Sequence, residues 1–130
     1  MIFIDCSIPR GVADWLKRDR SEVMWLGERF ELDVRDQVWL REAGESSWLV
    51  ITHDKKIRRR PSEKRALLES GVGCFILVYR DNLTKEEIYA LIVSVLDKME
   101  DLFRDTPRPF IYTVSKNREF KKYASGLVRP

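Results

Sequence analysis

The sequence predicts a three-layer α/β/α sandwich built around a mainly parallel five-stranded sheet. Short apolar runs alternate with segments of helical periodicity along most of the chain. Two of these runs, residues 48–52 (WLVIT) and 73–79 (GCFILVY), have no polar alternation, which is typical of strands buried on both faces. Strands that alternate with helices favour right-handed crossovers and a sheet covered on both sides.

The strands are predicted from their apolar runs and from what ends them. The first run is rich in isoleucine and is closed by Asp5, and the third is closed by His53 and Asp54. The last follows two prolines, Pro107 and Pro109, which separate it from the preceding helix. The five strands are predicted at residues 1–4, 22–26, 48–52, 73–79 and 110–114.

The helices are predicted from apolar spacing and from their start and stop signals. Pro9 and Pro61 suit first helical turns, whereas Gly44 and Gly71 suit helix ends. The longest helix follows Asn82–Leu83–Thr84, and its apolar residues repeat at three and four positions through Phe103. The four helices are predicted at residues 9–16, 35–43, 61–68 and 84–103.

Length and composition indicate one globular domain. The chain has 130 residues, of which 44% are hydrophobic, so it can bury a core and is not disordered. We assign residues 1–115 to the domain and 116–130 to a basic C-terminal tail with few core-forming residues. Cys6 and Cys74 lie in apolar runs and are expected to be buried free thiols. No signal peptide or membrane-spanning segment is recognisable, which predicts a cytoplasmic protein without membrane partners.

Positive charge is concentrated in two short segments. Residues 55–65 (KKIRRRPSEKR) carry seven basic side chains and one acidic side chain, and residues 116–130 carry five basic and one acidic. The rest of the chain is net acidic, although the whole carries a net charge of +3. This segregation favours a polyanionic partner, nucleic acid above all, over two merely solvated surfaces.

Acidic residues follow two of the predicted strands. Asp5 and Asp54 would meet at one edge of the sheet if the first and third strands are neighbours, because ligands bind at the carboxyl ends of parallel strands. Asp36, near the start of the helix that leads into the third strand, could face the same edge. Converging carboxylates repel one another unless a cation lies between them, and oxygen ligands suit Mg²⁺ or Mn²⁺. The alternative for Asp36 is a helix cap.

Other polar residues are weaker candidates for this site. Asp33 suits a loop or cap, Asp81 suits a turn but is a candidate fourth metal ligand, and Glu63 is explained by the dipole of its helix. His53, the only histidine, is more typical of a structural than a catalytic residue at a strand end. Zinc sites, serine or cysteine hydrolases and nucleotide-binding glycine loops have no matching motif.

The basic run begins directly after Asp54. It would place cations at the mouth of the acidic site, where they could hold the phosphates of RNA. The residues predicted to bind RNA are Lys55, Lys56, Arg58, Arg59 and Arg60.

The combined pattern resembles the PIN-domain family, in its compact form near VapC-type toxins. The resemblance rests on FIDCSIPR at the start, on residues 35–61 (RDQVWLREAGESSWLVITHDKKIRRRP), and on the strand–helix order to about Val114. It implies an endoribonuclease dependent on Mg²⁺ or Mn²⁺, often the toxin of a toxin–antitoxin pair and often a dimer.

Carried over by position, the resemblance assigns catalytic and metal-binding roles to three aspartates, Asp5, Asp36 and Asp54. It also implies that the hydroxyl of Thr52 supports Asp54. Larger PIN domains often have a fourth acid beyond the T-x-D element, where this chain continues with basic residues. Asp81 and Glu63 are the substitutes available.

Two other functions compete with a nuclease. A phosphoacceptor receiver domain would fit the size and the acid after the third strand, but it normally has adjacent acids after the first strand, where this chain has Asp5–Cys6. A non-catalytic PIN-like module that only binds RNA or protein would fit the missing fourth acid.

Overall fold

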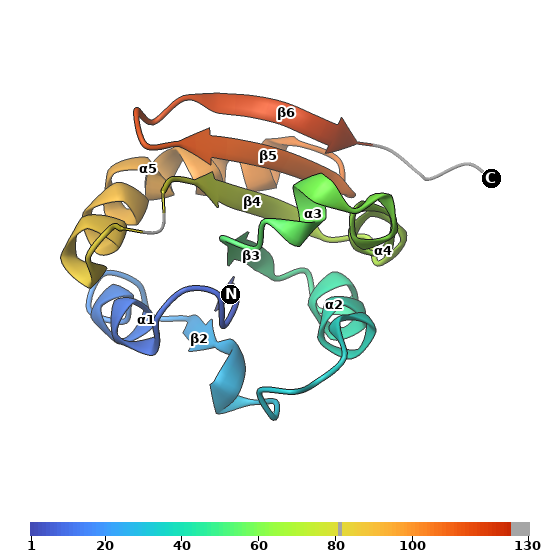
Figure 1. Cartoon of the computed structure of the whole chain (residues 1–130), viewed down its shortest axis with the longest axis horizontal. Coiled ribbons are helices and arrows are strands. Elements are labelled where there is room, and N and C mark those ends of the chain that lie inside the picture. The colour runs from blue at the N-terminus through green and yellow to red at the C-terminus, as the bar shows by residue number, and fades with distance from the viewer. Residues whose placement is uncertain (81, 126–130) are drawn as a thin grey trace.

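The computed structural model describes residues 1–80 and 82–125, which form one sheet between two layers of helices (Figure 1). The strands are β1 (Ile2–Ile4), β2 (Val23–Trp25), β3 (Leu49–Thr52), β4 (Gly73–Val78), β5 (Phe110–Ser115) and β6 (Phe120–Ser125). The helices are α1 (Arg10–Leu16), α2 (Asp36–Glu45), α3 (Lys56–Arg59), α4 (Pro61–Glu69) and α5 (Lys85–Asp105), with a 3₁₀ turn at Leu26–Glu28. The strand order is β2-β1-β3-β4-β5-β6, and every pair is parallel except β5–β6. The predicted three-layer α/β/α architecture is confirmed.

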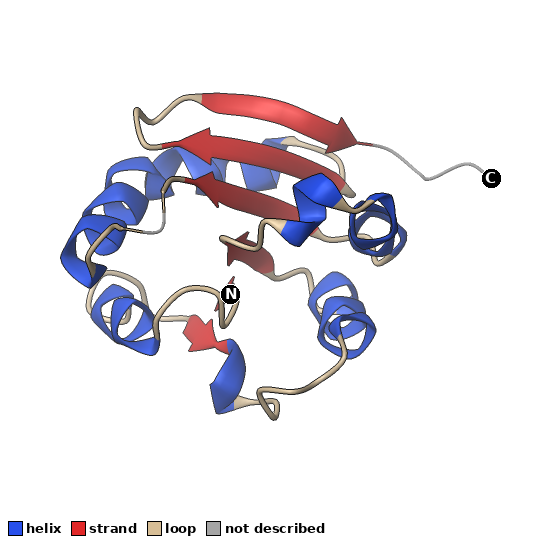
Figure 2. Ribbon diagram, in the orientation of Figure 1, coloured by secondary structure: helices blue, strands red, loops and turns tan. Residues whose placement is uncertain are grey.

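Side chains alternate between the two faces of the sheet, and each face is covered by its own helices (Figure 2). We call these the α1/α5 face and the α2/α4 face. On β1, Ile2 and Ile4 pack on the α1/α5 face, whereas Phe3 packs on the α2/α4 face. The same alternation continues through β3 and β4, so both faces are apolar. This explains why these strands read as continuous hydrophobic runs.

The prediction of five strands is wrong, because the sheet has a sixth. β6 lies within the segment assigned to the basic tail and pairs antiparallel with β5 at the edge of the sheet. The sequence of β6, FKKYAS, does not alternate cleanly between apolar and polar residues. The reason is a register shift in its pairing with β5, which breaks the two-residue period. Residues 126–130 lie outside the described part of the chain.

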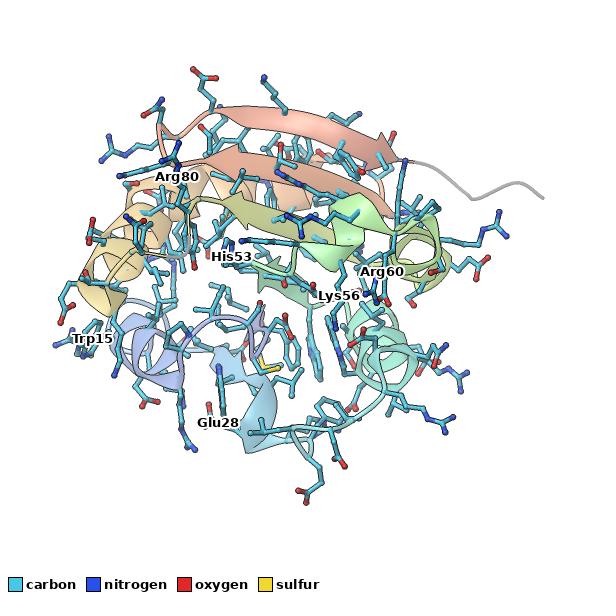
Figure 3. All side chains as sticks on the ribbon, viewed as in Figure 1. Trp15, Glu28, His53, Lys56, Arg60 and Arg80 are labelled. Atoms are coloured by element: carbon cyan, nitrogen blue, oxygen red, sulfur yellow. The ribbon has the colours of Figure 1, made fainter. Side chains whose placement is uncertain are left out.

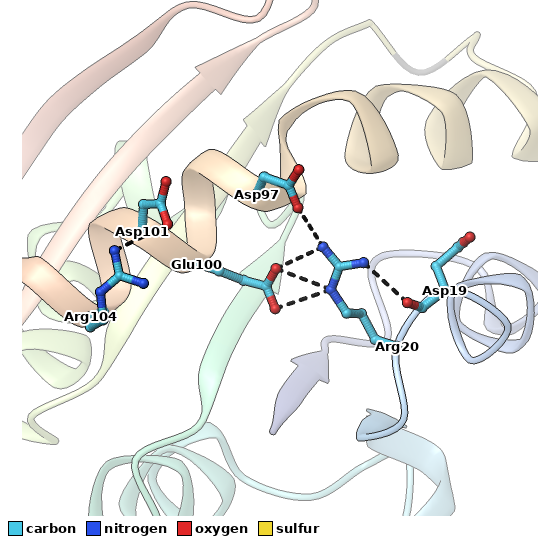
Figure 4. A network of polar contacts seen from close by, with 6 residues as sticks. All are labelled: Asp19, Arg20, Asp97, Glu100, Asp101 and Arg104. Atoms are coloured by element: carbon cyan, nitrogen blue, oxygen red, sulfur yellow. Dashed lines mark hydrogen bonds and ion pairs between the residues drawn. The ribbon is translucent and has the colours of Figure 1, made fainter.

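The longest helix, α5, is fixed at both its start and its middle. Thr84 and Glu87 form a reciprocal capping box at its N-terminus. Arg20, in the turn after α1, donates hydrogen bonds to Asp97 at 2.7 Å and to Glu100 at 2.8 Å (Figure 4). These contacts hold α1 against α5. Within the described ranges, no helix combines the length and apolar character needed to cross a membrane.

Candidate active site

The carboxyl ends of β1 and β3 bring Asp5 and Asp54 to the same edge of the sheet. The two strands are parallel neighbours, with Ile4 opposite Ile51. The backbone N–H of Asp5 continues this pairing by donating to the carbonyl of Ile51 at 3.0 Å. The adjacency on which the predicted acidic site depends is therefore present.

Asp5 is the most firmly held of the acids. Its side chain is buried, and Oδ2 accepts hydrogen bonds from Ser7 Oγ at 2.7 Å and from Thr52 Oγ1 at 2.8 Å. The Ser7 hydroxyl in turn accepts the backbone N–H of His53 at 2.9 Å. Oδ2 thus accepts both hydroxyls, and the Cys6 thiol also hydrogen-bonds with the Asp5 side chain.

Thr52 contacts both strand-end acids through its hydroxyl. Its hydroxyl donates to the carboxylate of Asp5 and accepts the backbone N–H of Asp54 at 3.0 Å. Thr52 thus orients the Asp5 side chain and the Asp54 main chain, whereas the Asp54 carboxylate accepts the N–H of Lys56 at 2.9 Å.

Asp36 reaches the site from the first turn of α2. Arg35 is the N-cap and no side chain caps the helix, so Asp36 is not a helix cap. Its Oδ1 accepts the indole N–H of Trp39 at 3.1 Å. The Trp39 ring is stacked on Phe3 of β1, with ring centroids 5.3 Å apart. The helix start is thereby tied to the strand that carries Asp5.

One open cavity joins these three aspartates. Its volume is about 480 Å³. The lining residues come from the ends of β1 and β3, the loop before α2 and the start of α3, and they are Asp5, Cys6, Ser7, Leu32, Asp33, Val34, Arg35, Asp36, Asp54 and Lys56.

Comparison with known proteins agrees with this geometry. A family model described as a PIN like domain matches residues 1–79, which include the three aspartates and every strand that positions them. The chain belongs to the PIN-like domain family. It is also 31% identical over 122 residues to "Putative ribonuclease VapC45" of Mycobacterium tuberculosis (strain ATCC 25618 / H37Rv), an alignment that covers 90% of this chain and 87% of that protein. No solved structure matches the chain significantly.

In this PIN domain a fourth acid, Glu63 in the first turn of α4, contacts Asp36 without lining the cavity. Burial, the negative charge of Asp36 and a hydrogen bond with the Asp36 side chain raise the pKa of Glu63, and Asp54 adds to the effect. The dipole of α4 alone does not explain these contacts. Sequence reasoning undervalued Glu63 because only the packing of α4 beside α2 reveals them. Asp81, the other substitute, lies outside the described residues.

We expect Glu63→Gln to raise the melting temperature of the metal-free PIN domain at pH 7. The raised pKa means that the Glu63 carboxyl binds its proton more tightly in the folded state than in the unfolded state, where a glutamate has a pKa of about 4.3. Above the folded-state pKa, ionised Glu63 therefore costs stability, and glutamine removes that cost. The gain should shrink as the pH falls towards 4, where both states bind the proton.

Thermal unfolding in EDTA across this pH range measures the effect. Glu69→Gln, at the other end of α4, is the matched control and should change the melting temperature little at any pH. A lower melting temperature for Glu63→Gln at pH 7 would contradict the repulsion among these acids.

The donor chemistry of this PIN domain fits a divalent cation. Within residues 1–80 and 82–125, no three His, Cys, Asp or Glu side chains stand close enough together to form a ready metal cage. The three aspartates nevertheless share one cavity, and the raised pKa of Glu63 shows that its negative charge and that of Asp36 repel each other. A hard cation such as Mg²⁺ or Mn²⁺ would relieve this repulsion, provided that the side chains turn towards it.

The basic residues after Asp54 occupy a short helix of the PIN domain, α3, that sequence analysis did not predict. Lys56 lines the acidic cavity, whereas Lys55, Arg58 and Arg59 line a small neighbouring cavity. Arg60 is the residue between α3 and α4. Figure 3 shows Lys56 and Arg60 on the side of the sheet where α2 and α4 lie.

His53 lies outside the acidic cavity, whereas Cys6 lines that cavity but does not ionise at neutral pH. His53 is stacked on Tyr79 with centroids 3.7 Å apart, its Nδ1 lies 2.8 Å from the Leu77 carbonyl oxygen, and it does not line the acidic cavity. The prediction that both cysteines are buried is wrong, because Cys6 is exposed and only Cys74 is buried. Partial desolvation and the charge of Asp5 raise the pKa of Cys6 to about 11, so it stays a thiol at neutral pH.

Proposed function

We propose that this PIN domain is a divalent-metal-dependent endoribonuclease that hydrolyses phosphodiester bonds in RNA. The observation that carries the proposal is the convergence of Asp5, Asp36 and Asp54 on one cavity, with Glu63 in contact with Asp36. Four carboxylates with one lysine beside them form a donor set suited to a hard cation and a phosphate. The similarity to a protein named as a ribonuclease supports the same reaction.

Each acid has a role that follows from its contacts. Asp5, with Oδ2 fixed by Ser7 and Thr52, offers its carboxylate as a rigid metal ligand. Asp36 and Asp54 complete the ligand set, and Glu63 serves as the fourth acid, either as a ligand or as a proton acceptor. A bound Mg²⁺ or Mn²⁺ ion supplies Lewis-acid stabilisation of phosphoryl charge and activates water for attack. Lys56 neutralises charge that develops on the phosphate.

The substrate we propose is single-stranded or looped RNA. Side chains cannot read the narrow major groove of an A-form duplex, whereas an unpaired strand can enter an open cavity lined by carboxylates. Lys55 directly precedes Lys56, and Arg58, Arg59 and Arg60 follow it; these four residues would hold flanking phosphates. We further propose that the protein acts in the cytoplasm as the toxin of a toxin–antitoxin pair, with an antitoxin protein and a second copy of itself as partners.

The strand order does not exclude a receiver domain, but the family of the chain disfavours one. The order of β2-β1-β3-β4-β5 also occurs in doubly wound folds that include receivers. Membership of the PIN-like family and the contact of Glu63 with Asp36 favour the nuclease. The binding-only module predicts RNA binding without cleavage, and it is compatible with the absence of a ready metal cage among residues 1–80 and 82–125.

Incubation of the full chain with a mixed RNA pool tests the function directly. We expect cleavage with Mg²⁺ or Mn²⁺ and none with EDTA. A melting temperature that rises with added Mg²⁺ would show separately that the acids bind the ion. Binding of RNA without cleavage by folded protein under every metal condition would favour the binding-only module and contradict the nuclease.

A further inference from the structure

Residues of β6, α3 and the start of α4 place cations and a tyrosine on one face of the sheet, outside the lining of the acidic cavity. We call this the α3–β6 surface and define it by Arg58, Lys64, Lys121 and Tyr123. The Tyr123 hydroxyl donates to the carbonyl of Arg58 at 3.3 Å, and the Lys64 ammonium lies 5.0 Å from the centroid of the Tyr123 ring. The tyrosine is still 37% exposed, so part of it remains available to a ligand.

Strand register assigns Lys121 and Lys122 to opposite faces of the sheet. Lys122 is opposite Tyr112, which packs against the core on the α1/α5 face. Lys121 is opposite Thr113, the next residue of β5, and therefore lies on the α2/α4 face with α3. The register shift lies between the Lys122–Tyr112 and Ala124–Ile111 pairs, and Tyr123, the extra residue there, contacts α3 and α4. Two adjacent lysines of equal charge thus have different surroundings.

The α3–β6 surface is connected to the acidic cavity through α3. Lys56 lines the cavity, and the Arg58 carbonyl that accepts the Tyr123 hydroxyl is two residues further along the same helix. The four residues of α3 span about 6 Å at the usual helical rise. Across the described part of the chain, no carboxylate forms an ion pair with Arg58, Lys64 or Lys121. The cations are therefore available to an anionic ligand.

We propose that the α3–β6 surface holds the RNA strand beyond the nucleotides that occupy the acidic cavity, an inference that rests on the proposed function. Cations that alternate with an exposed aromatic ring suit single-stranded RNA, because lysine and arginine bind phosphates while a ring stacks on a base. Lys121 and Arg58 hold phosphates, and Tyr123 contacts a base. The C-terminal strand β6, which lies outside the matched residues 1–79, thus determines the length of RNA that the protein binds.

Binding of labelled RNA by full-length protein carrying Asp5→Asn, which removes a proposed metal ligand, tests this surface. Lys121→Ala should weaken binding of a long single strand, about 16 nucleotides, by roughly three- to tenfold and lower the log–log salt slope by about 0.7. It should have little effect on binding of a dinucleotide, which is short enough to remain at the acidic cavity. Tyr123→Leu should weaken binding of the long strand about tenfold, whereas Tyr123→Phe keeps the ring and most of the affinity.

Lys122→Ala is the matched control, because it removes the same charge from the other face of the same strand. Equal losses for Lys121→Ala and Lys122→Ala, or no loss for either, would overturn the inference, provided that melting temperatures confirm folding. Competition by oligoglutamate as strong as that by RNA would instead assign the surface to an acidic protein and overturn it too. Failure of the wild type to cut or bind any RNA would overturn the proposed function itself, a result separate from any difference between the lysine variants.

Discussion

Asp5→Asn is expected to abolish RNA cleavage while the protein stays folded. Asparagine retains an oxygen that can accept the hydrogen bonds of Ser7 and Thr52, so the local network survives. It lacks the negative charge that a divalent ion requires from the buried carboxylate. Loss of a principal catalytic group typically reduces turnover by about 10³-fold or more, which is the loss we expect in a cleavage assay with Mg²⁺.

Asp33→Asn is the matched control for this variant. Asp33 lines the same cavity, but it lies on the loop before α2 rather than at the end of a strand. We therefore expect its removal to change the cleavage rate only a few-fold. Equal losses in the two variants would mean that cleavage depends on the total charge of the cavity and not on a placed ligand. Thermal unfolding of both variants establishes whether any loss comes from unfolding.

Gly44→Ala is expected to cause a large loss of stability, although alanine favours helix. Gly44 lies near the end of α2, and a Cβ at this position would overlap the carbonyl oxygen of Ser70 at the C-cap of α4. Because that oxygen belongs to the backbone, the helices must separate. Overpacking of this kind costs about 2–3 kcal/mol, which corresponds to a fall in melting temperature of about 10 °C for a domain of this size.

Gly11→Ala provides a control with the opposite expected sign. A Cβ on Gly11 in α1 would lie 3.4 Å from Cδ of Lys85, an ordinary contact with a flexible side chain. We expect this variant to gain about 0.5–1 kcal/mol from helix propensity. If both variants were stabilised, the close approach of α2 and α4 would be wrong. Separation of these helices should also weaken cleavage, because α2 carries Asp36 and α4 carries Glu63.

Local signals in the sequence were sufficient to predict the layers and the edge that carries the acids. Buried parallel strands appear as apolar runs, and residues at their carboxyl ends meet wherever the strands are neighbours. Asp5 and Asp54 could therefore be paired from sequence, and Asp36 could be placed close to them. The roles of these residues remain a prediction, but their shared cavity follows from this arrangement.

The features that sequence analysis missed depend on contacts between distant segments. The position of Glu63 in the first turn of α4 suggests only a favourable interaction with the helix dipole. Its contact with Asp36 depends on the packing of α4 beside α2. β6 was assigned to a tail because an edge strand with a register shift has no clear hydrophobic period. The exposure of Cys6 and the hydrogen bond from Thr52 to Asp5 depend on where the chain turns after each strand.

The fold class, the order of the five parallel strands along the chain and the acids that end two of them can be predicted from local sequence patterns. The fourth acid in contact with Asp36, and the lysine of β6 that shares a face with α3, become visible only in the folded chain. The difference lies in the distance along the chain over which each property is set. Burial and periodicity appear in the pattern of residues that are close in sequence. Repulsion between carboxylates and the pairing of an edge strand arise between residues that are far apart in sequence and meet only on folding.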